Sequence, residues 1–117
     1  MFAFQHFDIK PDIVCLSKSI AGGMPMGITI GNGKIPISIG KHGSTFGGSP
    51  LACAAAVATI DYIQNHNLVK AAAQKGKYFL EKLKKIQSSI IREVRGVGLM
   101  IGIETRIKVK PIVLELM

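Results

Sequence analysis

The sequence has 117 residues, of which 48% are apolar and 19% charged, with a formal net charge of +8. This composition excludes a disordered chain, and the length suffices for one modest domain with a hydrophobic core. The longest apolar run, Leu51–Ile60, is too short to span a bilayer, and the first residues lack the pattern of a signal peptide. We therefore expect a cytoplasmic protein without a membrane partner.

The positive charge and the two cysteines limit the possible partners. A net charge of +8 raises nucleic acid as a partner, but most of the excess lies in residues 66–95, on the outer face of an expected helix. Such a run is typical of a solvated helix surface, and apart from Tyr78 and Phe79 it has no interleaved aromatic residues for base stacking. Cys15 and Cys53 lie in apolar segments without metal-ligand spacing, so we expect no metal and two buried thiols in a reducing compartment.

The first segments of the chain lead to a single lysine. Residues 1–10 contain three phenylalanines and His6 without a clear period, and we expect them to lie against a core. Asp12–Leu16 is an apolar, β-branched run that predicts a short strand, and Lys18 follows it directly. A glycine turn, Gly22–Pro25, comes next.

Lys18 lies where α/β folds place their ligands, at the carboxyl end of a strand. In such a pocket, partial desolvation lowers the pKa of a lysine and makes it a nucleophile toward a carbonyl carbon. The alternative is an ordinary surface lysine at the start of a loop.

The stretch after the glycine turn contains a second strand, a loop and a helix start. Met26–Gly31 predicts a strand that ends at an Asn-Gly turn, and residues 33–41 predict a loop. A Gly/Ser/Thr loop then leads to Ser49, the expected N-cap, and Pro50, the expected first helical residue. The alanine-rich helix expected over Leu51–Tyr62 must pack closely on a neighbour.

The second half of the chain predicts one long helix and two strands. Apolar residues recur at helical spacing over Asn67–Ile86, and Lys108–Met117 is a further amphipathic segment. Two strands, Ile90–Arg95 and Leu99–Glu104, flank a Gly-Val-Gly turn. A change of composition near His66 predicts two units, residues 1–65 and 66–117, of the α/β class.

The loop His42–Pro50, HGSTFGGSP, has the ingredients of a phosphate cradle. Its glycines free backbone N–H groups, Ser44 and Thr45 add hydroxyl donors, and a helix N-terminus follows. The alternative is a plain helix-capping turn. Gly96–Gly102 superficially resembles a dinucleotide fingerprint but opens a strand instead of a helix, so we discount it.

A strand-end lysine and a phosphate-type loop together indicate a cofactor that carries both an aldehyde and a phosphate. Pyridoxal phosphate fits both features, because its aldehyde bonds a lysine and its phosphate favours hydroxyl donors at a helix terminus.

The motif PDIVCLSKSIAGGMPMG resembles the cofactor-lysine motif of the class III pyridoxal-phosphate aminotransferases of fold type I. HGSTFGGSPLACAAA resembles a second signature of that family, and REVRGVGLMIGIE its signature in the C-terminal domain. Within the family, the sequence is most similar to the acetylornithine and acetyl-lysine aminotransferases, including the branch that uses a precursor bound to a carrier protein.

The resemblance implies roles for three residues. Lys18 is the lysine that forms a Schiff base with pyridoxal phosphate and carries the proton. Thr45 contacts the cofactor phosphate across the interface of a homodimer, and Ser44 contacts the substrate. Arg95 matches a family arginine, for which we favour a structural role, with binding of the substrate carboxylate as the alternative. The implied activity moves an amino group between glutamate or 2-oxoglutarate and the terminal semialdehyde of an N-acylated ornithine or lysine precursor.

Other features of the family have no counterpart in the sequence, among them the aspartate that pairs the pyridine nitrogen and the arginines that bind the substrate carboxylate. We therefore interpret residues 1–65 as the end of the large cofactor domain, residues 66–117 as part of the small domain, and the isolated chain as inactive. The alternatives are another class III enzyme, such as an ornithine or 4-aminobutyrate transaminase or a glutamate semialdehyde aminomutase, or a basic module without catalytic activity.

Overall fold

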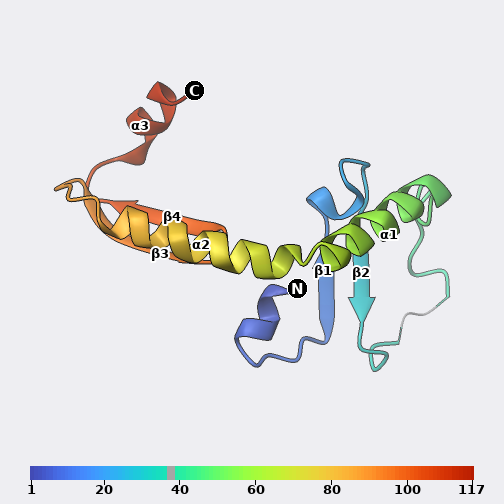
Figure 1. The fold of residues 1–117 in the computed structure, drawn as a ribbon. Helices are drawn as coiled ribbons and strands as arrows, with labels where there is room; N and C mark the ends of the chain where they lie inside the picture. Colours follow the sequence, from blue (N-terminus) through green and yellow to red (C-terminus); the bar gives the residue numbers. More distant parts are fainter. Residues whose placement is uncertain (37–38) are drawn as a thin grey trace. The chain divides into compact units, whose positions relative to one another are not determined.

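The computed structural model describes residues 1–36 and 39–117, which divide into two compact units, Met1–His66 and Asn67–Met117 (Figure 1). Both units combine helices with strands, as the sequence predicts. In chain order the elements are η1 (Ala3–His6), β1 (Ile13–Leu16), η2 (Lys18–Ala21), β2 (Ile28–Gly31), α1 (Pro50–Asn65), α2 (Leu68–Lys84), β3 (Ile91–Val97), β4 (Met100–Thr105) and α3 (Val109–Glu115), where η marks a 3-10 helix.

In the first unit, β1 and β2 form an antiparallel pair in which Leu16 lies opposite Ile28 and Ile13 opposite Gly31. The segment between the two strands contains η2 and the glycine turn. Helix α1 packs against η2, at the end of the strand pair where β1 finishes and β2 begins (Figure 1). The strand pair and α1 therefore hold the segment with Lys18 from two sides.

Alanine brings α1 close to its neighbour. Ala52 and Ala56 of α1 are buried, and so is Ala21 of η2. Residues four apart lie on the same face of a helix, so Ala52 and Ala56 form one small-residue stripe toward η2. Because an alanine side chain ends at Cβ, the two backbones approach closely, which confirms the packing expected of this helix.

In the second unit, β3 and β4 form an antiparallel hairpin with Val97 opposite Met100. Gly98 and Leu99 connect the strands, and Gly98 has a φ of +56°, which suits a two-residue turn that begins with glycine. Helix α2 packs along this hairpin (Figure 1).

The closest approach of α2 to the hairpin is at Gly76, which is buried. A Cβ atom at Gly76 would lie 1.9 Å from the carbonyl oxygen of Gly98, and one at Gly96 would lie 2.5 Å from that of Met100. The glycines of the REVRGVGLM motif therefore belong to a hairpin and its contact with a helix, and not to a nucleotide site.

The expected hydrophobic core is not present in residues 1–36 and 39–117, where the only buried apolar side chains are those of three alanines. Large apolar residues such as Phe46, Leu51 and Met100 are exposed. The prediction was wrong because a two-stranded sheet and one helix make too few layers to enclose a large side chain. Cys15 is likewise exposed and Cys53 only partly buried, so the expectation of two buried thiols was also wrong.

Most expected elements are present with shifted ends. Strand β3 continues to Val97, two residues beyond the expected end, because Gly96 pairs with Ile101 across the hairpin. The segment expected to lie against a core contains η1 and is mostly exposed. The predicted loop over residues 33–41 has no helix or strand at 33–36 and 39–41, and its residues 37 and 38 lie outside the described residues. No helix in the described part is long and apolar enough to cross a membrane.

The contact between Gly76 and Gly98 makes a prediction about stability. Gly76→Ala adds a methyl group where the hairpin backbone already lies, so α2 and the hairpin must separate. Overpacking of this kind costs about 1–3 kcal/mol, which exceeds the gain of about 1 kcal/mol that alanine brings to a helix interior. We expect a lower free energy of unfolding in urea.

Gly102→Ala is the matched control, because the nearest atom to a Cβ at Gly102 is the Cγ of Arg95 at 3.9 Å, an ordinary contact. Equal stability of the two variants would contradict the importance of the Gly76 contact.

Candidate functional site

Lys18 is the first residue of η2 and directly follows Ser17, which separates it from β1. Its backbone is in the left-handed region, with φ of +60°. This conformation costs a residue other than glycine about 1–2 kcal/mol, and such strain persists only where the surroundings impose it. Strained residues are concentrated at functional sites, so the backbone of Lys18 supports its selection as a candidate.

The surroundings of Lys18 hold its backbone and leave its side chain free. The N–H of Gly22 donates to the carbonyl of Ser19 at 3.1 Å, and the N–H of Met24 donates to that of Ala21 at 3.1 Å. Ala21 is 2% exposed, whereas Lys18 is exposed. The desolvated lysine expected from the sequence is therefore not found, because η2 packs on α1 through Ala21 and not through Lys18.

The loop before α1 is built from turns. The N–H of Gly47 donates to the carbonyl of Ser44 and that of Ser49 to Phe46, each at 3.3 Å, and Gly48 has a φ of +74°. Ser44 and Thr45 are exposed, and neither hydroxyl has a hydrogen-bond partner within the described ranges. Both hydroxyls are therefore available to a ligand.

Helix α1 begins as predicted, with Ser49 at the N-cap and Pro50 as the first helical residue. The carbonyl of Ser49 accepts the N–H of Cys53 at 2.9 Å, but its hydroxyl makes no capping bond. The N-cap position expected for Ser49 is thus confirmed, although its side chain does not form the capping bond common at such a position. A free hydroxyl at the positive end of a 16-residue helix favours an anion.

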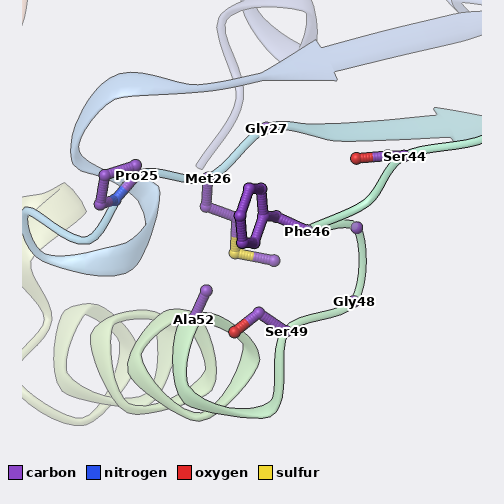
Figure 2. A pocket seen from close by; sticks show the side chains of 9 residues that line it. Pro25, Met26, Gly27, Ser44, Phe46, Gly48, Ser49 and Ala52 are labelled. Atoms are coloured by element: carbon purple, nitrogen blue, oxygen red, sulfur yellow. The ribbon is translucent and has the colours of Figure 1, made fainter.

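A hollow of about 270 Å³ lies between this loop, the start of α1 and the segment before β2. Figure 2 shows Ser49, the N-cap residue, and Ala52 of α1 on one side of it, and Met26 on the other. Phe46 comes from the loop between them, and Ser44 also lines the hollow. Neither Lys18 nor Thr45 is among the lining residues. The structure therefore brings Ser44, but not Thr45 or Lys18, to the hollow beside the start of α1.

The charge around these groups is one-sided. No acidic residue occurs between Asp12 and Asp61, whereas Lys18, Lys34 and Lys41 fall in that stretch. An amine, free hydroxyls and a helix N-terminus, without a carboxylate among them, fit a ligand that has an aldehyde and a phosphate. No group of three or more His, Cys, Asp or Glu side chains in the described part of the chain could hold a metal ion.

Arg95 has partners on its own hairpin. Its Nη1 donates to Glu104 Oε2 at 2.9 Å and to Glu93 Oε2 at 3.2 Å, and Arg92 Nη1 lies 2.8 Å from Glu104 Oε1. Glu93 and Glu104 are cross-strand partners, and like charges in such a pair repel. The hydrogen bond and the charge of Glu104, together with the charge of Glu93, raise the pKa of Arg95. The structure thus supports the structural role expected for this arginine.

Several residues at the hollow were not identified from the sequence. Phe46 lies in a loop without periodicity, and Met26 is expected only as part of a strand, so no pattern marks either residue as part of a site. Ala52 could have been found, because it belongs to the alanine-rich stretch that is expected to pack closely on a neighbour.

The chain as a whole matches a known protein family. The family model for class III aminotransferases matches residues 1–116. An acetylornithine aminotransferase of Methanopyrus kandleri is 48% identical over 105 residues, which are 88% of this chain and 27% of that protein. A LysW-aminoadipate semialdehyde transaminase of Deinococcus radiodurans is 45% identical over 113 residues, 95% of this chain and 26% of that protein.

Solved structures give the same result. The crystal structure of an acetylornithine aminotransferase from Elizabethkingia anophelis superposes with a TM-score of 0.85 and 38% identity, over 97% of this chain and 30% of that chain. An ornithine aminotransferase from Plasmodium yoelii also gives 0.85 and 38%, over 97% of this chain and 32% of that one. The chain belongs to the class III aminotransferases, a family of pyridoxal-phosphate enzymes. It spans between about a quarter and a third of the length of these relatives.

The ion pairs of Arg95 predict how the melting temperature of an Arg95 variant depends on salt. Arg95→Ala leaves Glu93 opposite Glu104 with only Arg92 to balance them, so the melting temperature should fall at low salt. The loss should shrink in about 1 M salt, where charges are screened beyond about 3 Å. The KM for the amino-acid substrate should not change, because the charge of Arg95 is already paired.

Arg106→Ala is the control, since its side chain has no ion pair among residues 1–36 and 39–117. A large rise in KM for Arg95→Ala, with an unchanged melting temperature, would point to substrate binding instead.

Proposed function

We propose that these residues form part of a pyridoxal-phosphate aminotransferase. It moves an amino group between glutamate or 2-oxoglutarate and the terminal semialdehyde of an N-acylated ornithine or lysine precursor, in arginine or lysine biosynthesis. The observation that carries the proposal is Lys18, a strained lysine at a strand end within a sequence that matches the class III family over residues 1–116. The names of the relatives with 45–48% identity support the N-acylated substrate.

Bound pyridoxal phosphate would supply an aldehyde for the lysine and an electron sink for the reaction. In this proposal, Nζ of Lys18 holds the cofactor and moves the proton at the carbon that bears the amino group. The exposed side chain and fixed backbone of Lys18 support this role, because the amine can reach a ligand while its starting point stays in place.

We assign Thr45 to the cofactor phosphate of the other subunit in a homodimer and Ser44 to the substrate. Both hydroxyls are exposed, and neither is engaged in the described part of the chain, as such roles require. A threonine that acts on the other subunit need not approach the Lys18 of its own chain.

We also propose that residues 1–65 belong to the large cofactor domain and residues 66–117 to the small domain of a cytoplasmic enzyme. The separation of the described residues into Met1–His66 and Asn67–Met117 supports this division. A carrier protein that presents the blocked amino acid is a further possible partner, suggested by the relative from Deinococcus radiodurans.

A free ornithine is the second candidate substrate, because the ornithine aminotransferase from Plasmodium yoelii is as similar in fold as the acetylornithine enzyme. The two substrates differ in charge at the α-amino group, which N-acylation removes. Glutamate formation from 2-oxoglutarate with N-acetylornithine and with ornithine, measured in the enzyme that contains these residues, separates the candidates. Higher kcat/KM for ornithine would contradict the proposed substrate.

Lys18→Ala tests the catalytic assignment in the same assay. Loss of a positioned acid–base group lowers a rate by about 100- to 10,000-fold, and the covalent attachment of the cofactor is lost as well. We expect turnover to fall at least that far, and the absorbance near 400–430 nm that the family resemblance implies to disappear. Lys34→Ala, at another exposed lysine of the same unit, should leave both unchanged. Turnover of Lys18→Ala within a few-fold of the unsubstituted enzyme would exclude the assignment.

Thr45→Ala tests the phosphate contact. A hydrogen bond to a charged group is worth about 1.5–3 kcal/mol, so cofactor affinity should fall about 10- to 100-fold, with the fold intact. Equilibrium dialysis with pyridoxal phosphate measures this. Thr29→Ala, at an exposed threonine of β2, is the control. If Thr45→Ala retains the cofactor as well as Thr29→Ala, the loop is only a helix-capping turn.

A further inference from the structure

Thr59 lies beneath the turn that ends η2, and its hydroxyl has a fixed orientation. Its Oγ1 donates to the carbonyl oxygen of Ala55, one turn back in α1, at 2.8 Å. A Cβ atom at Gly22 would lie 3.1 Å from the same Oγ1, which is closer than most real contacts of such atoms. The backbone of Gly22 therefore passes directly over the hydroxyl of Thr59.

The turn above Thr59 needs support from outside. Gly22 has a φ of +62° and closes η2, and Lys18, the first residue of η2, has a φ of +60°. A 3-10 helix of four residues has few hydrogen bonds of its own, so it does not hold a strained lysine unaided.

Helix α1 supplies this support at the end of η2. Ala52 and Ala56 are buried on the face of α1 that meets η2, where Ala21 is buried too. Thr59 follows Ala52 by seven residues and Ala56 by three, so it continues the same face. The alanines thus pack where Ala21, the last residue of η2, is buried, and Thr59 lies at Gly22, the residue that follows it.

We infer that Thr59 is a positioning residue for Lys18. By fixing Gly22, it fixes the segment from which the lysine side chain extends, so that Nζ approaches an aldehyde in one geometry. Thr59 acts through the turn and does not touch the ligand. The inference rests on the role proposed above for Lys18.

Replacing the hydroxyl of Thr59 with a methyl group tests the inference. Thr59→Val replaces Oγ1 with a methyl group, which loses the bond to Ala55 and requires carbon–carbon distances of about 3.5–4.0 Å. We expect the larger methyl group to press on the turn at Gly22 and to displace it. Thr59→Ser keeps the hydroxyl and removes only the methyl group. Val57→Thr makes the reverse change at an exposed position about 200° around the helix, where no turn lies above it.

The experiment measures the reactivity of Lys18 itself. The enzyme that contains these residues is freed of cofactor, treated with limiting pyridoxal phosphate as the aldehyde probe, and reduced with borohydride. Peptide mass spectrometry then gives the modification of Lys18 relative to Lys34 and Lys41, two exposed lysines of the same unit. This ratio is measured within one molecule, so it does not depend on the amount of protein.

We expect a strong preference for Lys18 in the unsubstituted enzyme, in Thr59→Ser and in Val57→Thr. In Thr59→Val we expect the ratio to fall by about 10- to 100-fold, the effect of a displacement of about 1 Å on a positioned group. An unchanged ratio in Thr59→Val would overturn the inference and leave the role of Lys18 intact. No preference for Lys18 even in the unsubstituted enzyme would overturn the role of Lys18, and the inference with it.

Circular dichroism of each variant controls for loss of the fold. If Thr59→Val loses helix signal, Thr59→Ser and Thr59→Ala decide, because both lack the methyl group and only serine has the hydroxyl. A preference retained in serine and lost in alanine supports the inference, and equal ratios in the two contradict it.

Discussion

The close approach of α1 to η2 is the contact on which the candidate site depends. It is possible only because the facing positions hold Ala21, Ala52 and Ala56, whose side chains end at Cβ. A larger residue at any of the three would separate the helix from the turn. Since Lys18 begins that turn in a strained conformation, the alanines determine where the lysine stands, although none of them has a chemical function.

In the second unit, glycine allows a similar close approach between a helix and a neighbouring backbone. There, the hairpin backbone at Gly98 comes so near to α2 that even a Cβ at Gly76 would overlap it. The two contacts differ in what they position. The contact of α1 with η2 positions a residue with a reactive side chain, whereas the contact of α2 with the hairpin positions only the hairpin. The small residues of both motifs are thus explained by backbone approach, and only the first has consequences for chemistry.

Many of the strands and helices could be predicted from the sequence, because they depend on patterns of neighbouring residues. The strand before Lys18 and the helix start at Ser49 and Pro50 depend on apolar runs and helix-start chemistry, and both are present. The core was mispredicted, because composition counts apolar residues such as Phe46 and Met100 without showing that anything covers them. The exposure of Lys18 was missed for the same reason, since desolvation depends on distant neighbours. The support from Thr59 joins residues far apart in the chain, so no sequence pattern contained it.

The left-handed backbone of Lys18 has a further consequence. At this position glycine would adopt the same φ without a steric penalty, and asparagine with a smaller one, so lysine is not the residue that the backbone prefers. Selection for thermal tolerance alone would therefore tend to remove it. A lysine at this position lowers the stability of the fold. Such a cost is expected where a reactive side chain is kept for its function. In a collection of stabilised variants of this protein, position 18 should be where gains in melting temperature coincide with complete loss of the reaction.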